Sequence, residues 1–104
     1  MGNPYAGEVT LVIDGQAHRL RLTLGALAEL EAGLGEATIL DLVERFEQGR
    51  FSSRDVLALL VAGLRGGGWQ GQAQDLTAVE IEGGLHAAAR CAAQLLARAF
   101  TPPA

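Results

Sequence analysis

The sequence predicts an α+β fold that is mostly α, with an N-terminal β-hairpin packed on a bundle of four or five short helices. Apolar and polar residues alternate in the first quarter of the chain, which is typical of strands. Leucines and alanines recur at helical spacing in the rest. The length, 104 residues, is that of one ordinary domain. We therefore expect residues 1–104 to form a single domain.

The hairpin is predicted over about residues 7–23. Asp14-Gly15 marks its turn, because both positions tolerate positive φ. Counting outward from that turn pairs Val9 with Leu20 and Glu8 with Arg21. This register places the charges on one face and the apolar residues on the other, as a half-buried hairpin requires. A lone hairpin is only marginally stable in water, so its apolar face should lie on helices.

Three helices are predicted in the middle of the chain, over about residues 24–34, 38–48 and 52–65. Each follows a residue suited to the N-cap position: Thr23, Thr38 and Ser52. The second and third also have an aspartate three residues on, the pattern of a capping box. The third has little polar surface, so we expect it to be the central helix.

A glycine-rich segment, residues 66–75, is predicted to be a flexible loop. Gly66-x-Gly68-x-x-Gly71 matches a dinucleotide-binding fingerprint, but it follows a helix and no parallel βαβ unit is available. A capping-box pattern from Thr77 to Glu80 then predicts a helix over residues 77–83. Gly83-Gly84 should break that helix.

The last helix is predicted over residues 84–100, with one apolar stripe and one polar face. The polar face carries His86, Arg90, Gln94 and Arg98 at steps of four. The alanine-rich stripe either closes the bundle or mediates self-association. Its residues are Leu85, Ala89, Ala92, Leu96 and Ala99.

The charge pattern excludes several classes of partner. The formal net charge is −4, and all 8 basic residues are arginines scattered along the chain. A nucleic-acid-binding domain needs basic charge gathered on one face, so we expect no nucleic acid partner. We also expect no membrane partner, because there is neither a basic amphipathic helix nor an apolar run of roughly 20 residues. The lone Cys91 cannot form an intramolecular disulfide, which suits the reducing cytoplasm.

No cluster of residues predicts catalysis, a metal site or a cofactor. Ser52 and Ser53 are the only serines, and Ser52 is already expected to be the N-cap of a helix. His18 and His86 lie on different predicted elements and share the chain with a single cysteine. These residues do not make a zinc site, and we expect the protein not to be an enzyme.

Three residues are the candidates for binding another protein: Arg65, Trp69 and Phe100. Trp69 is the only tryptophan, and it lies in the glycine-rich segment rather than on a helix stripe. Two interpretations are open: the ring folds back over the core, or it anchors a partner, as exposed tryptophans often do. Arg65 beside it fits either interpretation.

Several segments together resemble one family. They are Asn3-Pro4-x-x-Gly7-Glu8-Val9-x-Leu11, the Asp14-Gly15 turn, Leu24-Gly25-Ala26-Leu27-Ala28-Glu29-Leu30-Glu31 with Leu34-Gly35, Asp55-Val56, and Ala62-Gly63-Leu64-Arg65-Gly66. From about Asn3 to Phe100 the chain resembles small gene transfer agent and prophage proteins of the tail-gene cluster. These proteins are variously called tail tube protein or tail assembly chaperone.

The resemblance implies a non-enzymatic role in building a phage-like tail. It implies a tail assembly chaperone that binds the tape measure protein, keeps it soluble and helps recruit tail tube subunits. Tube subunits are usually larger and richer in β-structure, so the resemblance favours the chaperone for this mostly helical sequence. The expected location is the cytoplasm of the bacterial cell that produces the particle.

Two alternatives stay open beside the chaperone. The first is a structural tail or head-tail component that is retained in the particle. The second is a small helical DNA-binding regulator in which residues 52–64 would mimic one helix of a helix-turn-helix, although the net charge of −4 opposes it.

Overall fold

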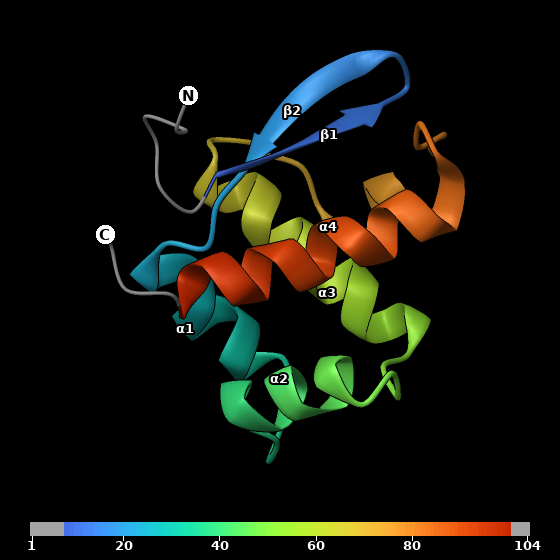
Figure 1. Ribbon diagram of the computed structural model, residues 1–104. Helices are drawn as coiled ribbons and strands as arrows, with labels where there is room; N and C mark the ends of the chain where they lie inside the picture. Colours follow the sequence, from blue (N-terminus) through green and yellow to red (C-terminus); the bar gives the residue numbers. More distant parts are fainter. Residues whose placement is uncertain (1–7, 101–104) are drawn as a thin grey trace, which may run out of the picture.

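The computed structural model describes residues 8–100 (Figure 1). A β-hairpin is followed by helices, so the predicted fold class is confirmed. The elements are β1 (Val9–Ile13), β2 (Gln16–Leu20), α1 (Leu24–Ala32), α2 (Ile39–Glu47), α3 (Ser53–Gly66), the 3-10 helix η1 (Ala73–Leu76) and α4 (Gly84–Ala99).

The hairpin has the register that the sequence predicts. β1 pairs antiparallel with β2, with Val9 opposite Leu20 and Ile13 opposite Gln16. Asp14 and Gly15 have φ angles of 50° and 80°, the left-handed values that a two-residue turn of this kind needs. One face of the hairpin is buried, through Val9, Leu11, Ile13 and Leu20.

Side-chain caps fix the starts of the first three helices, as predicted. The Thr23 hydroxyl accepts from the Ala26 N–H at 3.0 Å. Thr38 and Ser52 each form a full capping box, in which the aspartate three residues on accepts in return from the backbone N–H of the cap. These bonds satisfy donors that a helix N-terminus otherwise leaves unpaired.

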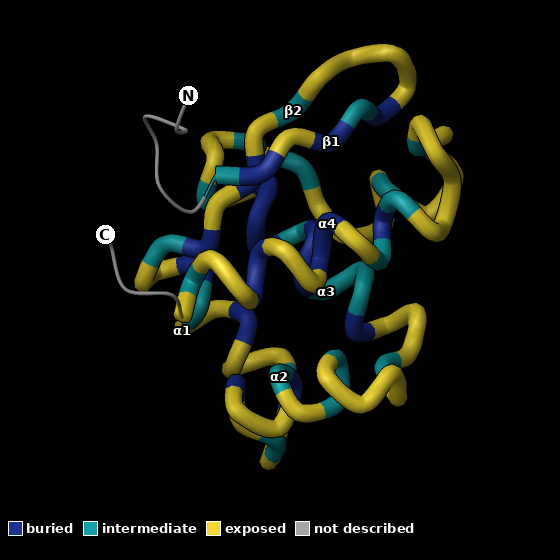
Figure 2. The backbone as a smooth tube through the Cα atoms, in the orientation of Figure 1, coloured by how far each residue is buried: buried dark blue, intermediate teal, exposed yellow. Residues whose placement is uncertain are grey.

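Helix α3 is the central element. It contacts α1, α4, β2 and η1, and Leu59, Leu60 and Leu64 are among its buried residues. Gly63 allows the close approach, because a Cβ there would lie 2.7 Å from Leu95 Cδ1 and 3.1 Å from Leu20 Cβ. The buried stretches of backbone therefore converge on the middle of the molecule, around α3 and α4 (Figure 2).

The carboxyl end of α3 and the Gly67 cap after it pack directly on the backbone of residues 19–21, where β2 ends. A Cβ at Gly66 would lie 1.8 Å from the Arg21 carbonyl oxygen, and one at Gly67 would lie 2.0 Å from the Arg19 carbonyl oxygen. The Arg21 N–H donates to the Gly63 carbonyl at 2.9 Å. The predicted loop over 66–75 is therefore wrong at both ends, since Gly66 belongs to α3 and Ala73–Leu76 forms a 3-10 helix.

The predicted helix over residues 77–83 is also wrong. Instead, Ile81 forms an antiparallel bridge with Ile13 of β1. The Asp14 N–H donates to the Glu80 carbonyl at 2.7 Å, and the Glu82 N–H donates to the Val12 carbonyl at 3.0 Å. The local capping signal fails here because the edge of β1, distant in sequence, satisfies these backbone groups instead.

Helix α4 starts where the glycine pair predicts, but its buried face is turned from the predicted stripe. Gly83 and Gly84 have φ angles of 86° and 70° and lead into the helix. Leu85, placed on the stripe by its spacing, is 85% exposed. Ala92 and Leu96 of the predicted stripe are buried, and three residues outside that stripe are buried with them: Ala88, Cys91 and Leu95.

Candidate partner-binding site

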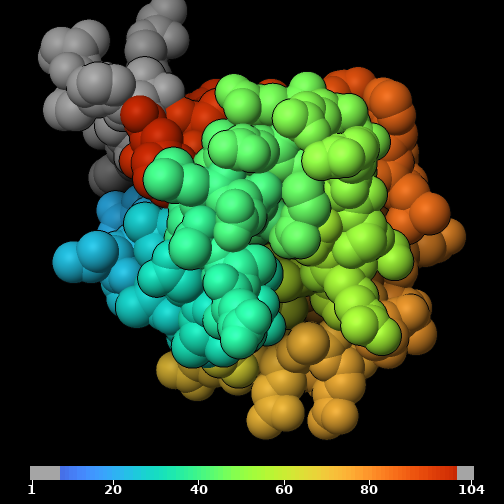
Figure 3. Space-filling model, turned by 90° about the horizontal axis from the view of Figure 1, so that it is seen from below, coloured from blue at the N-terminus to red at the C-terminus, as the bar shows by residue number. Residues whose placement is uncertain are grey.

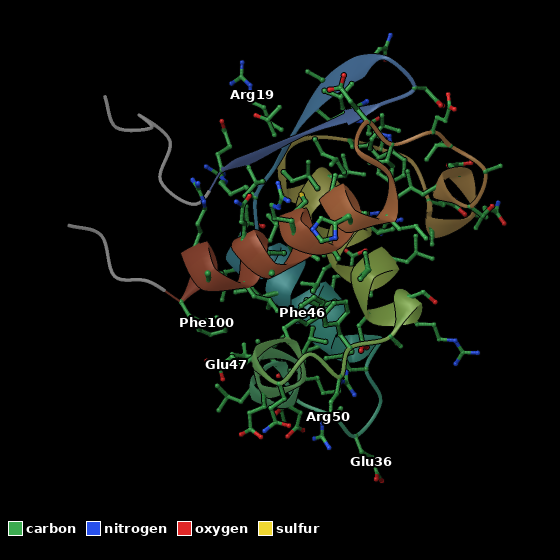
Figure 4. All side chains as sticks on the ribbon, turned by 45° about the vertical axis from the view of Figure 1, so that its right-hand side comes forward. Arg19, Glu36, Phe46, Glu47, Arg50 and Phe100 are labelled. Atoms are coloured by element: carbon green, nitrogen blue, oxygen red, sulfur yellow. The ribbon has the colours of Figure 1, made fainter. Side chains whose placement is uncertain are left out.

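A groove lies between α2 and the carboxyl half of α4. Its volume is about 420 Å³. Phe100 and Phe46 come from its two sides, and Glu47 lies on the α2 side (Figure 4). The walls are mostly apolar, and the lining residues are Val43, Phe46, Glu47, Ala93, Leu96, Ala97 and Phe100.

A second groove lies against the amino half of α4. The start of α3, η1 and the Ile81 segment form its other walls, and its volume is about 300 Å³. It contains no charged side chain. Its lining residues are Phe51, Ser52, Ser53, Val56, Leu57, Leu60, Leu76, Ile81, Leu85, Ala88 and Ala89.

A stacked aromatic pair lies between the two cavities. The rings of Phe46 and Phe51 are 4.4 Å apart between centroids, with an interplanar angle of 6°. Phe46 lines the first cavity, Phe51 lines the second, and α4 is a wall of both. We call the two cavities together the α4 groove. The two cavities share no lining residue, and the α4 residues that line one or the other extend from Leu85 to Phe100, roughly 22 Å at the rise of an α-helix.

The α2 rim of the α4 groove is acidic. Glu44 and Glu47 are exposed on this helix. Arg45, the basic residue of α2, turns away toward α3, where its Nη2 lies 3.0 Å from Asp55 Oδ1. Asp41 and Arg45 are spaced i, i+4 on α2, a spacing that favours an ion pair within the helix, but the structure pairs Arg45 with Asp55 and so links α2 to α3. The outward charge of α2 is therefore negative.

A third hollow separates α1 from α3 and η1, and it can be seen between these elements in Figure 3. Its volume is about 260 Å³. Leu57 lines both this hollow and the second cavity of the α4 groove, so apolar surface continues around α3. Glu29 and Arg54 place one charge of each sign on its lining.

The structure separates the three predicted partner-binding residues. Arg65 forms an ion pair with Glu29, and its Nε donates to the Gly71 carbonyl at 3.3 Å. Trp69 is half-buried against the core, with its ring over Gly71, where a Cβ would lie 2.1 Å from Trp69 Cζ2. Phe100 is 49% exposed and lines the α4 groove. Of the three, Phe100 is the one placed to contact a partner in that groove.

A family model described as phage tail tube protein, GTA-gp10, matches residues 6–101. The chain belongs to this family. No curated protein and no solved structure matches it at a significant level. Membership places the chain among the structural, non-enzymatic kind of tail protein, whose members associate with other tail components.

Two residues with potential chemistry, Ser52 and Cys91, have structural roles in this GTA-gp10 family member. Ser52 caps α3. Cys91 is buried, and burial raises the pKa of its thiol to about 11, which opposes formation of a nucleophilic thiolate. Within residues 8–100, no group of three or more His, Cys, Asp or Glu side chains is arranged to hold a metal ion. Over the same range, no helix is both long and apolar enough to cross a bilayer.

Among the lining residues of the α4 groove, Phe100 is the one that the sequence marked as a partner-binding candidate, because apolar residues at helical spacing are typical of a core-facing stripe. Val43 and Phe46 belong to the apolar stripe of α2, but the structure buries Ile39 and Leu42 and leaves the other two half-exposed. Leu85 belongs to the stripe that was expected either to close the bundle or to mediate self-association, and the structure leaves it 85% exposed. The apolar stripes of these helices are wider than one neighbouring helix can cover, and this width could have indicated apolar surface left open to a partner.

Proposed function

We propose that this protein is a tail assembly chaperone of a phage-like particle or gene transfer agent. In this role it binds the tape measure protein in the cytoplasm of the producing cell, keeps it soluble and helps tail tube subunits assemble around it. Family membership supports a role in the tail. The form of the molecule supports the chaperone over a tube subunit.

The hairpin offers little strand edge for building a tube wall. Within the described range the sheet has two strands. The end of α3 covers the outer edge of β2 through Gly66 and Gly67. The edge of β1 near the turn is paired with the Ile81 segment. Strand-to-strand assembly needs a row of unpaired backbone groups, and these contacts remove much of that row.

The observation that carries the proposal is the α4 groove. Amphipathic helices bind other proteins by laying their apolar face in such a groove. Phe100 and Leu85, 49% and 85% exposed, lie near its two ends. A tape measure protein, implied to be largely long helix, would present the matching apolar faces.

Co-expression with the tape measure protein of the same gene cluster tests this function. We expect a larger soluble fraction of tape measure protein and its co-purification with this chain. A tape measure protein that stays equally insoluble, and never co-purifies, would contradict the proposal. The α4 groove then gives a specific control, since a variant that blocks it should lose the effect.

The alternative is a structural component that stays in the tail or at the head-tail junction. Membership of a family described as a tail tube protein favours this alternative. It differs from the chaperone in one measurable respect, because a retained component is present in finished particles and a chaperone is not.

A further inference from the structure

We propose that the α4 groove binds an amphipathic helix of about four turns whose apolar face is flanked by basic residues on the side next to α2. This inference rests on the proposed function in taking a partner helix as the occupant. It adds the place, length and charge of that helix. Three features of the groove support it: its dimensions, its exposed apolar residues and its charge.

The length of the groove fits a helix of that size. The wall from Leu85 to Phe100 spans about 22 Å, which is the length of roughly 15 helical residues. Ala89, Ala93 and Ala97 line this wall, and their small side chains allow another helix to come close. A small folded loop or a single aromatic side chain would fill one cavity and leave the other open.

The apolar residues of the groove are distributed so that a helix would contact them in turn. Leu85 lies at one end, Phe100 lies at the other, and the stacked pair of Phe46 and Phe51 lies between. Exposed aromatic and large aliphatic side chains are the usual anchors of helix-in-groove interfaces. Partner residues spread over about four helical turns could pack beside these three points.

The negative charge beside the groove favours a partner helix with basic residues. Glu47 lines the groove and Glu44 is exposed on the same helix, whereas Arg45 of α2 is paired with Asp55 of α3. An acidic rim attracts basic side chains and repels acidic ones. A second copy of this chain is a poorer occupant, because each copy carries a formal net charge of −4.

Two synthetic peptides of about 16 residues serve as probes. Both carry the same stripe of leucine and alanine, and they differ only in having lysine or glutamate beside it. Fluorescence anisotropy of the labelled peptides measures binding to the full chain. We expect the lysine peptide to bind at least about tenfold more tightly at low salt, with the advantage shrinking as salt rises.

Substitutions within and outside the groove then locate the binding site. Ala93→Trp fills the groove from an exposed position and should weaken binding of the lysine peptide at least about tenfold. Ala28→Trp, at an exposed site of α1, should leave that binding unchanged. Glu47→Lys should reduce the preference for the lysine peptide several-fold. Glu36→Lys, an equal charge change in the α1–α2 turn, should preserve it. Circular dichroism confirms that each variant is folded.

Equal binding of the two peptides, or full binding by a folded Ala93→Trp variant, would overturn the inference. So would self-association that Ala93→Trp abolishes, seen by sedimentation without peptide binding, because the occupant would then be a second copy. The chaperone function can fail separately. Peptides that bind as described beside a tape measure protein that is never solubilised would refute the function and leave the groove assignment standing.

Discussion

Glycine residues allow the closest contacts between elements in this molecule. Gly63, Gly66 and Gly67 lie where α3 meets β2, and a Cβ at any of them would come within 3 Å of a neighbouring atom. From the sequence, the last two belong to a glycine-rich run that is typical of a loop. Their role is visible only with β2 in place, because composition does not distinguish a mobile glycine from a tightly packed one.

Replacement of Gly66 by alanine should destabilise the protein strongly. The added Cβ would lie 1.8 Å from the Arg21 carbonyl oxygen, so α3 or β2 must shift, and we expect a loss of about 3 kcal/mol. Gly25→Ala is the matched control in α1, where the Cβ meets only Thr23 Oγ1 at 3.9 Å. Urea denaturation followed by circular dichroism measures both. Equal stabilities for the two variants would refute the close packing.

Cys91 should make stability depend on pH in the alkaline range. Burial raises the pKa of its thiol to about 11, above the usual value of the unfolded chain, roughly 8.5. Between these values the unfolded state loses the proton first, so stability falls as pH rises through the window. The chain contains no lysine, so few other side chains titrate there.

Comparison with Cys91→Ala isolates this effect. At about pH 8 the melting temperature of the wild type should be well above that of the variant, and this difference should be smaller at about pH 10.5. If the difference in melting temperature were the same at both pH values, the thiol would have the same pKa in the folded and unfolded chains.

At the scale of elements, local signals place the helix starts and distant contacts orient the helices. Thr23, Thr38 and Ser52 cap their helices as the sequence predicts, because a capping box needs only four consecutive residues. The same type of signal at Thr77 fails, since Ile81 pairs with Ile13 instead. Sequence patterns carried no information on that pairing or on the ion pair that ties α2 to α3.

The two capping-box aspartates should differ in their contribution to stability. Asp41 is exposed and only caps α2, so Asp41→Ala should cost about 1 kcal/mol. The Asp55 side chain is 11% exposed and also binds Arg45, so Asp55→Ala should cost about 3 kcal/mol. Thermal or urea denaturation gives both values. If Asp41→Ala proved the more costly, the tie between α2 and α3 would not be a significant stabilising contact.

At the scale of the whole molecule, the sequence predicted the fold class, the hairpin register and the central helix. It predicted the candidate site only in part. Phe100 lies in the α4 groove, whereas Arg65 is held by Glu29 and Trp69 packs against the core. The groove itself could not be predicted, because it depends on how far α2 stands from α4, and helical periodicity does not specify that distance.

The abundance of this chain in finished particles distinguishes a tail assembly chaperone from a retained structural component. Quantitative mass spectrometry would compare the ratio of this chain to the tail tube subunit in producing cells with the same ratio in purified particles. A chaperone leaves once the tail is built, so we expect the chain to be absent from the particles or strongly depleted. A ratio in the particles equal to that in the cells would contradict it and identify the chain as a retained structural component.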